Sequence, residues 1–190
     1  MRKLIFFMHA SLDGFVAGPN GELDWIMIED EIFDFVDTMT DQADAALYGR
    51  ITYDIMQSYW PTAADQPDAT KHDKKHAAWY QDVSKIVLSR TMGHEGLGRT
   101  TIISDALKDK IGSIKNQEGK NILIFGSPSA SHALLQEGLI DEFWIFVNPV
   151  ILGQGIPLFK GSSAKTKLNL IETQTFSCGV IALHYETKLD

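Results

Sequence analysis

A strand–helix–strand pattern in the second half of the chain constrains the fold more than any other segment. An apolar strand is expected over residues 121–125 and a second over 142–147. Between them, Ser127 is a typical N-cap residue, and Pro128 suits the first helical position because its missing N–H would have no partner there. Gly138 is a natural residue to end this helix. Parallel strands are often joined through such a helix, so the pattern predicts a parallel sheet with helices packed on it.

The rest of the sheet is predicted from short runs of apolar, β-branched and aromatic residues bounded by Gly, Pro or charged residues. These runs cover residues 4–10, 45–48, 85–88, 101–103, 168–176 and 180–187. The last two are separated by a turn near residues 177–179, which is typical of a β-hairpin. No internal repeat and no shift in composition marks a boundary, so we expect one α/β domain over residues 1–190.

Two segments between the predicted strands have a clear character. Residues 32–39 have apolar side chains at helical spacing, and we interpret the acidic residues on the other side as a face in contact with solvent. These acidic residues are Glu31, Asp34, Asp37 and Asp41. Residues 61–75 are polar and include two prolines, which indicates a long surface excursion.

The composition of the chain excludes several partners. Among 190 residues, 25 are acidic and 17 basic, and the net charge of −8 would repel the phosphate backbone of a nucleic acid. The single cysteine, Cys178, cannot form an internal disulfide, which favours the cytoplasm. No segment approaches the ~20 apolar residues that span a bilayer, so we expect no membrane partner.

Three predicted strands are followed by groups that can bind phosphate. Residues 48–52, 88–91 and 125–129 place Gly, Ser, Thr or Arg directly at a strand end. Each motif alone is a weak signal, because an Arg after a strand is usually a surface residue. Together, at the carboxyl ends of parallel strands, they indicate a dinucleotide, because ligands of open α/β sheets gather at that edge.

The usual dinucleotide fingerprint is absent from the sequence. No Gly-x-Gly-x-x-Gly opens a helix after a predicted strand, and we interpret Gly93, Gly96 and Gly98 as a flexible turn. The sequence therefore disfavours a standard Rossmann domain.

Five short motifs occur in order along nearly the whole chain. They lie at residues 9–17, 47–53, 87–90, 125–128 and 141–159. In this order they resemble the dihydrofolate-reductase-like family, most closely its branch with the reductase domain of bacterial riboflavin biosynthesis. The resemblance implies a three-layer α/β fold, with a central, mostly parallel sheet flanked by helices and an antiparallel strand at the carboxyl terminus.

The resemblance also implies NADPH as the cofactor. Arg50 and Thr52 would meet cofactor phosphates, whereas Ser89 and Arg90 would hold the adenosine end and its 2′-phosphate, since a guanidinium offers bidentate contacts to phosphate. The turn at 126–129 would bind the pyrophosphate. The full set of implied cofactor residues is Phe15, Val16, Gly49, Arg50, Thr52, Ser89, Arg90, Phe125, Gly126, Ser127 and Ser129, of which Phe15 and Val16 would flank the nicotinamide.

One position departs from the family pattern. Dihydrofolate reductases carry a Gly-Gly pair with a cis bond at the pyrophosphate turn, whereas here Gly126 is followed by Ser127. The sequence leaves open whether this bond is cis or trans, and the Ser127 hydroxyl offers a compensating contact.

The substrate side is less specific. By the resemblance, Asp13 is the first candidate to orient or protonate a substrate, and Asp24 is the second. Either is equally well explained as a turn residue. Trp25, Tyr53 and Trp60 are candidates for an aromatic wall against a flat heterocycle, although aromatic residues near strand ends are as often part of the core.

Other chemistries have weaker support. Ser127, Ser129 and His132 lack the Gly-x-Ser-x-Gly context of a hydrolase nucleophile. His72 and His76 have the spacing of zinc ligands on one helical face, but lysines surround them, so we interpret them as part of a solvated helical segment without a metal.

These observations favour an NADPH-dependent reductase that transfers hydride to a small heterocyclic or imine-like substrate, with riboflavin-pathway-reductase-like or dihydrofolate-reductase-like chemistry. The alternative is a non-catalytic module that binds or senses NADPH or another nucleotide on the same fold. Apolar residues at 143–146, together with the resemblance, favour a homodimer.

Overall fold

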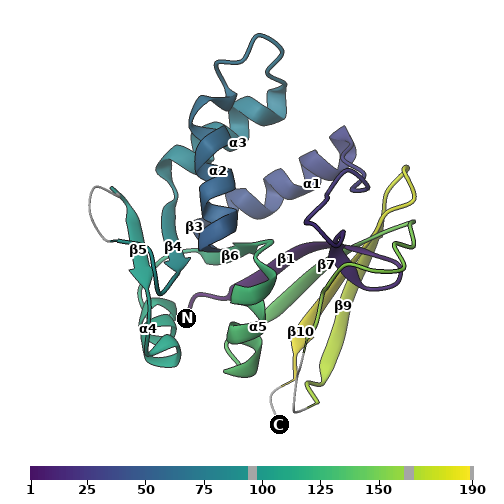
Figure 1. The fold of residues 1–190 in the computed structure, drawn as a ribbon. Helices are drawn as coiled ribbons and strands as arrows, with labels where there is room; N and C mark the ends of the chain where they lie inside the picture. The colour runs from purple at the N-terminus through teal and green to yellow at the C-terminus, as the bar shows by residue number, and fades with distance from the viewer. Residues whose placement is uncertain (94–97, 161–164, 189–190) are drawn as a thin grey trace.

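An eight-stranded sheet runs through the centre of the molecule (Figure 1). The structure is a computed structural model and describes residues 1–93, 98–160 and 165–188; Gly96, part of the expected glycine turn, lies outside these residues. The strands of the sheet are β1 (Leu4–Ser11), β3 (Ala43–Gly49), β4 (Ser84–Leu88), β5 (Thr100–Ile103), β6 (Asn121–Phe125), β7 (Glu142–Asn148), β9 (Leu168–Thr175) and β10 (Ile181–Thr187). A separate pair is formed by β2 (Phe15–Ala17) and β8 (Ile156–Pro157).

Most of the large sheet is parallel. The strand order is β5-β4-β3-β6-β1-β7-β10-β9, and every neighbouring pair from β5 to β7 is parallel. β10 is antiparallel to both β7 and β9. The predicted fold class is therefore confirmed, and the strands expected from the sequence are present with ends that differ by at most two residues.

Helices cover both faces of the sheet (Figure 1). The helices are α1 (Asp30–Asp41), α2 (Arg50–Ala63), α3 (Lys71–Asp82), α4 (Leu107–Lys115) and α5 (Pro128–Gln136). Phe7 of β1 packs in one core with Ile32 of α1, whereas its neighbour Phe6 faces a second core with Ile111 of α4 and Leu134 of α5. The alternation of side chains along a strand thus divides the molecule into three layers. Among the helices of the described ranges, none has the length and hydropathy to cross a bilayer.

The segment at residues 61–75 is more regular than the sequence predicted. Helix α2 continues through Pro61 to Ala63, and α3 already begins at Lys71. The start of α3 is fixed by a capping box, in which the Asp73 N–H donates to Thr70 Oγ1 (3.1 Å) and the Thr70 N–H donates to Asp73 Oδ2 (2.9 Å). The prediction of a long excursion was wrong because these reciprocal bonds begin a helix within a polar segment.

The prediction of a solvated acidic face on α1 is wrong for Asp37. This residue is only 6% exposed, because α3 packs against it. Its carboxylate lies 3.1 Å from His72 Nδ1 and 3.5 Å from Lys75 Nζ, and the His72 ring stacks on Phe33 at 3.9 Å between centroids. His76 is buried one turn further along α3, so the expected solvated histidine segment is wrong as well. Asp37 is buried by the packing of α1 on α3, whereas His76 is buried against Trp60 of α2 and Phe125 of β6.

The buried His76 predicts a specific sensitivity to acid. Its Nδ1 has no hydrogen-bond partner within the described residues, and burial lowers its pKa to about 3. The unfolded chain, with a histidine pKa near 6.5, binds this proton more readily, so stability present at neutral pH is lost as the pH falls from about 6.5 toward 3. The wild type should lose about 2 kcal/mol of unfolding free energy between pH 7 and pH 4.5 because of this proton, and we expect H76F to abolish that part of the loss. Urea denaturation at the two pH values measures it. Equal losses in the variant and the wild type would contradict this account.

Candidate functional site

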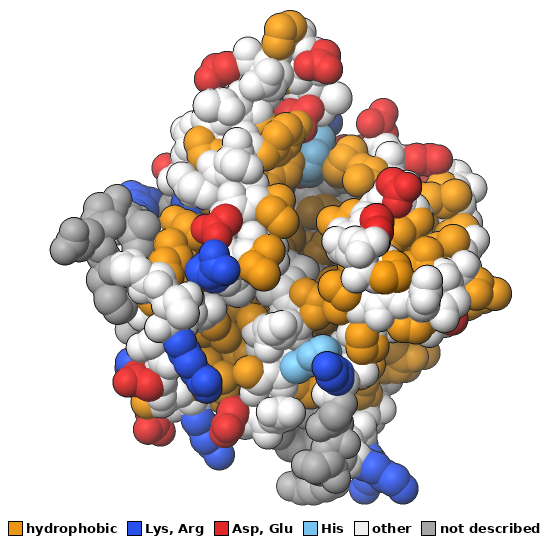
Figure 2. Space-filling model, viewed as in Figure 1, with side chains coloured by type: hydrophobic (Ala, Val, Ile, Leu, Met, Phe, Trp, Pro, Cys, Tyr) orange, Lys and Arg blue, Asp and Glu red, His pale blue; other side chains and the backbone are white. Residues whose placement is uncertain are grey.

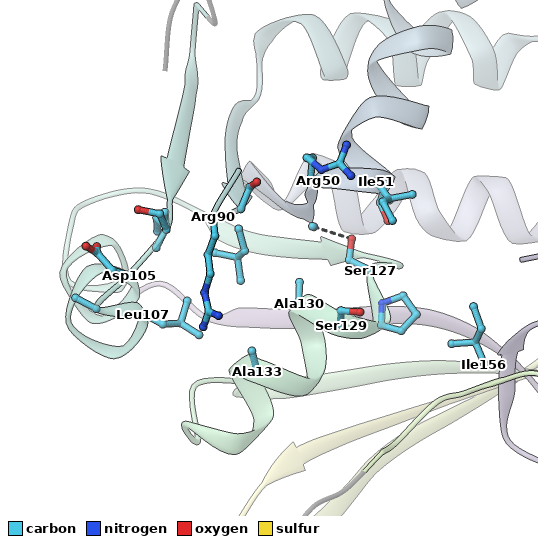
Figure 3. A pocket seen from close by; sticks show the side chains of 18 residues that line it. Arg50, Ile51, Arg90, Asp105, Leu107, Ser127, Ser129, Ala130, Ala133 and Ile156 are labelled. Carbon is cyan, nitrogen blue, oxygen red and sulfur yellow. Dashed lines mark hydrogen bonds between the residues drawn. The ribbon is translucent and has the colours of Figure 1, made fainter. Parts of the chain in front are cut away.

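A cavity of about 590 Å³ opens at the edge of the sheet where β3, β4 and β5 end (Figure 3). Its walls are the carboxyl ends of these strands and the first residues of α2, α4 and α5. The predicted cofactor residues that line it are Gly49, Arg50, Thr52, Ser89, Arg90, Ser127 and Ser129. The three strand-end motifs, separated along the chain, therefore meet in one place.

Three helices begin at this cavity. Their first residues, Arg50 of α2, Leu107 of α4 and Pro128 of α5, all line it. At none of these three N-termini does a side chain form a capping hydrogen bond. The first N–H groups of a helix have no partner within the helix, and the helix dipole makes this end positive. The cavity is therefore suited to a ligand that carries several negative groups.

The turn between β6 and α5 connects two strand ends. The Ser127 hydroxyl accepts a hydrogen bond from the Gly49 N–H (2.9 Å) and donates one to the Phe125 carbonyl (3.2 Å). Ser127 occupies the N-cap position, but its side chain does not cap α5, contrary to the prediction, because it is turned toward β3. Gly126 and Ser127 both have a positive φ, 57° and 58°, and the described part of the chain has no cis peptide bond.

Arg90 is the positive side chain that points into the cavity. In Figure 3 it extends from the end of β4 between Leu107 of α4 and Ala133 of α5. Within the described ranges no hydrogen bond or ion pair holds its guanidinium. Arg50, in contrast, donates to Asp54 Oδ2 (3.1 Å) one turn further along α2. Asp105 also lines the cavity, and its pair with Lys110 holds the pKa of its carboxyl below the usual value.

Phe15 and Val16 lie in the adjoining small sheet rather than in the cavity wall. They belong to β2, which pairs with β8, and Ile156 of β8 lines the cavity. The Leu158 N–H donates to the Gly14 carbonyl (2.8 Å), which further fixes β8 against the loop after β1. In Figure 3, Ile156 and Arg90 lie at opposite ends of the cavity. The two predicted nicotinamide residues are thus beside the end that is distant from Arg90.

The carboxylate of Asp13 joins two loops. Its Oδ1 accepts from the Ser11 hydroxyl (2.7 Å) and the Leu152 N–H (3.1 Å), and its Oδ2 accepts from the Gly153 N–H (2.8 Å). The hydrogen bond from Ser11 and those from Gly153 and Leu152 lower its pKa. These contacts stabilise the ionised form of Asp13. Asp24 is exposed, and no hydrogen bond to it is found within the described ranges.

The three predicted aromatic substrate residues do not line the cavity. Tyr53 is on the buried face of α2, with its hydroxyl 3.3 Å from Thr100 Oγ1. Trp60 packs on His76, with 4.0 Å between ring centroids. Trp25 lies in the segment before α1, where its Nε1–H donates to the Glu22 carbonyl (3.1 Å). The structure therefore brings the predicted cofactor residues together but not the predicted substrate residues.

The sequence of the whole chain matches one protein family. The model of the RibD C-terminal domain matches residues 2–182. The chain belongs to the RibD C-terminal domain family. A relative named "Uncharacterized protein YyaP", from Bacillus subtilis (strain 168), is 34% identical over 190 residues, which cover 97% of this chain and 94% of YyaP.

Solved structures agree with this membership of the RibD C-terminal domain family. A putative riboflavin biosynthesis protein from Shewanella sp. PV-4 has a TM-score of 0.76 and 25% identity, and the match covers 98% of this chain and 99% of that chain. A dihydrofolate reductase from Enterococcus faecalis, complexed with NADP(H), has a TM-score of 0.63 and 14% identity over 97% of this chain and 96% of its own. The resemblance inferred from the five motifs is confirmed.

Sequence reasoning missed Asn148, which organises the loops of this RibD C-terminal domain beside the cavity. The residue is fully buried at the end of β7. Its Nδ2 donates to the Phe146 carbonyl (3.0 Å) and lies 3.3 Å from His9 Nδ1, while its Oδ1 accepts from the Met27 N–H (2.9 Å). Burial lowers the pKa of His9 to about 4, so this imidazole is neutral at physiological pH. A polar residue that ends an apolar strand just before Pro149 was the available signal.

The role of Ser127 predicts a large effect of removing its hydroxyl. In S127A the partly buried Gly49 N–H and the buried Phe125 carbonyl lose their side-chain partner, which costs about 1–3 kcal/mol of unfolding free energy. S129A is the matched control, because Ser129 is exposed in the same turn, and we expect a change within about 0.5 kcal/mol. Urea denaturation of both variants measures the difference. Equal midpoints would show that the bond between β3 and β6 contributes nothing.

Proposed function

We propose that the protein is an NADPH-dependent reductase that transfers hydride to a small heterocyclic or imine-like substrate. One observation carries the proposal: three helix N-termini without side-chain caps and the free Arg90 guanidinium meet in one cavity. A dinucleotide phosphate carries a pyrophosphate and a 2′-phosphate, which match these two kinds of anion site. The structural similarity to a dihydrofolate reductase that was solved with NADP(H) supports the same assignment.

The chain's own residues divide the binding of the cofactor. Ser89 and Arg90 hold the adenosine end and its 2′-phosphate, and the N-terminus of α5 with Ser129 binds the pyrophosphate. Thr52 and the N-terminus of α2 contact the phosphates from the opposite wall. When bound, NADPH would supply the hydride. Phe15 and Val16, in the small sheet of β2 and β8, would then lie beside the nicotinamide.

The roles of the substrate residues are also a proposal. Asp24 is exposed and available to a substrate, so it is the stronger candidate to supply a proton. Asp13 already accepts three hydrogen bonds, and we assign it to orienting the loop at residues 152–153 against the site. Trp25 lies beside Asp24 in the segment before α1, whereas Tyr53 and Trp60 belong to α2 and pack in the core.

Cofactor binding is tested by thermal unfolding with NADPH and with NADH. NADPH at ~100 times its Kd should add about 2.7 kcal/mol of stability. We expect R90A to weaken NADPH binding at least about tenfold and to leave NADH binding unchanged, because only NADPH carries the 2′-phosphate. K74A removes the same charge from an exposed position on α3 and should change neither.

Three outcomes separate the alternatives. No stabilisation by either cofactor would overturn the proposal, and an unchanged preference for NADPH in R90A would remove the role of Arg90. NADPH binding without oxidation on a broad panel of heterocycles, imines, flavins and quinones would instead favour a non-catalytic binding or sensing module.

We also propose that the protein forms a homodimer in the cytoplasm. The apolar residues 143–146 do not provide the surface, because they are buried within the chain on both faces of β7. The exposed outer strand β9 is a better candidate, since Leu170 is 55% exposed and neighbouring Ile171 is also exposed at the edge of the sheet. Light scattering at micromolar concentration should give the mass of a dimer for the wild type and of a monomer for I171K. A monomeric wild type would exclude this proposal.

A further inference from the structure

The acceptor of the hydride must lie beyond the Ile156 end of the cavity, and this inference rests on the proposed function. Arg90 marks the 2′-phosphate end, and Ile156 lies at the opposite end in Figure 3. A dinucleotide bound between them with its 2′-phosphate on Arg90 would have its nicotinamide near Ile156. Figure 2 shows the surface hollowed between α2 and the segment that precedes α1, where a second molecule has access to that end.

The walls of this hollow are apolar. On α2, Ile51 is 68% exposed and Ile55 is 56% exposed, although both are large hydrophobic residues. The segment before α1 exposes Met27 and Ile28, and the bond from the Met27 N–H to Asn148 holds this segment at the end of β7. Hydrophobic side chains lie on both sides of the hollow in Figure 2. Exposed apolar groups that face a recess favour an acceptor with apolar faces.

The part of the chain that includes the segment before α1, and α1 itself, is acidic in sequence. Residues 4–49 contain ten Asp and Glu and no Lys or Arg, although the whole chain has a net charge of only −8. The first basic residue after Lys3 is Arg50, which is paired with Asp54. Figure 2 shows acidic side chains at the rim of the hollow.

Several of these carboxylates have no compensating charge. Asp37 and Asp41 pair with α3, Asp44 pairs with Arg2, and Asp13 is engaged in its loop. By contrast Glu29 and Asp30, at the start of α1, are exposed and form no ion pair within the described ranges. An anionic group at the hollow would be repelled over the ~8–10 Å that physiological salt leaves unscreened.

We propose that the acceptor site selects an uncharged or cationic acceptor with apolar faces and rejects one that carries phosphate. The acceptor gains a hydride from the reduced nicotinamide and one proton from solvent or a neighbouring acid, so it is reduced by two electrons as NADPH becomes NADP⁺. The two ends of the groove thus have opposite electrostatic preferences. The Arg90 end binds a phosphate, and the acceptor end excludes one.

A matched pair of acceptors tests the selection. Riboflavin and FMN share the same ring and differ in the phosphate, so their kcat/KM for NADPH oxidation isolates its effect. We expect riboflavin to be favoured about tenfold at low salt, and the preference to shrink in 0.5 M NaCl, because the repulsion is screened. Fluorescence quenching of both flavins in the presence of NADP⁺ measures the same preference without turnover. Equal values, or a preference for FMN, would overturn the proposal.

A second pair of acceptors, two quinones, tests the same selection if the protein does not reduce flavins. Menadione and 1,4-naphthoquinone-2-sulfonate differ mainly in a negative group, and we expect menadione to be favoured. If NADPH stabilises the protein but no member of either pair binds or is reduced, the proposed acceptor site is wrong. If NADPH does not stabilise the protein, the proposed reductase function itself fails, so the two failures are distinguishable.

Substitution of the unpaired carboxylates tests whether they cause the preference for riboflavin over FMN. We expect the double variant E29Q/D30N to reduce the preference for riboflavin over FMN about threefold, through a gain in kcat/KM for FMN. D68N/E118Q removes the same two charges from exposed positions away from the hollow and should leave the ratio unchanged. An unchanged ratio in E29Q/D30N, or an equal change in the control, would show that these carboxylates do not set the selection.

Discussion

The parallel direction of six neighbouring strands determines where this protein has free hydrogen-bonding groups. Because these strands run the same way, the helices that follow β3 and β6 begin at the same edge of the sheet, and α4 begins there after β5. The N-terminal N–H groups of three helices are therefore concentrated at one cavity. The bond between Ser127 and Gly49 fixes the distance between two of these helix starts. The suitability of this cavity for an anion therefore follows from the topology before any side chain contributes to it.

Much of the fold could be predicted because its signals are local. Each strand of the large sheet is marked by its own run of apolar residues, and helix α5 is marked by Pro128 at its start and by Gly138 after its end. The meeting of the strand-end motifs in one cavity could be predicted for the same reason, because each motif is contiguous and the parallel sheet brings the motifs together. The burial of Asp37 could not be predicted, because the helix that covers it, α3, lies more than thirty residues away along the chain.

The loops at the acceptor end were hard to predict because their contacts are distant in sequence. Asp13 accepts from the Gly153 N–H, and Asn148 accepts from the Met27 N–H, so each bond joins segments that lie more than a hundred residues apart. The sequence around these residues has no local pattern that predicts which distant segment each of them contacts. The aromatic candidates Tyr53 and Trp60 illustrate the same difficulty, since only the packing of α2 and α3 places them in the interior.

The attachment of the segment before α1 separates the two parts of the site structurally. The cofactor part is formed by strand ends and helix starts, which cannot change without changing the sheet. The proposed acceptor part depends on a stretch of residues 18–29 that forms no part of the large sheet and is held at the end of β7 by a hydrogen bond from the Met27 N–H to Asn148 Oδ1. Substitutions in this stretch can therefore alter the walls of the hollow while the cavity at the strand ends stays intact. Under the proposed function, related chains with this architecture would diverge in the molecules they reduce while they keep a common source of electrons.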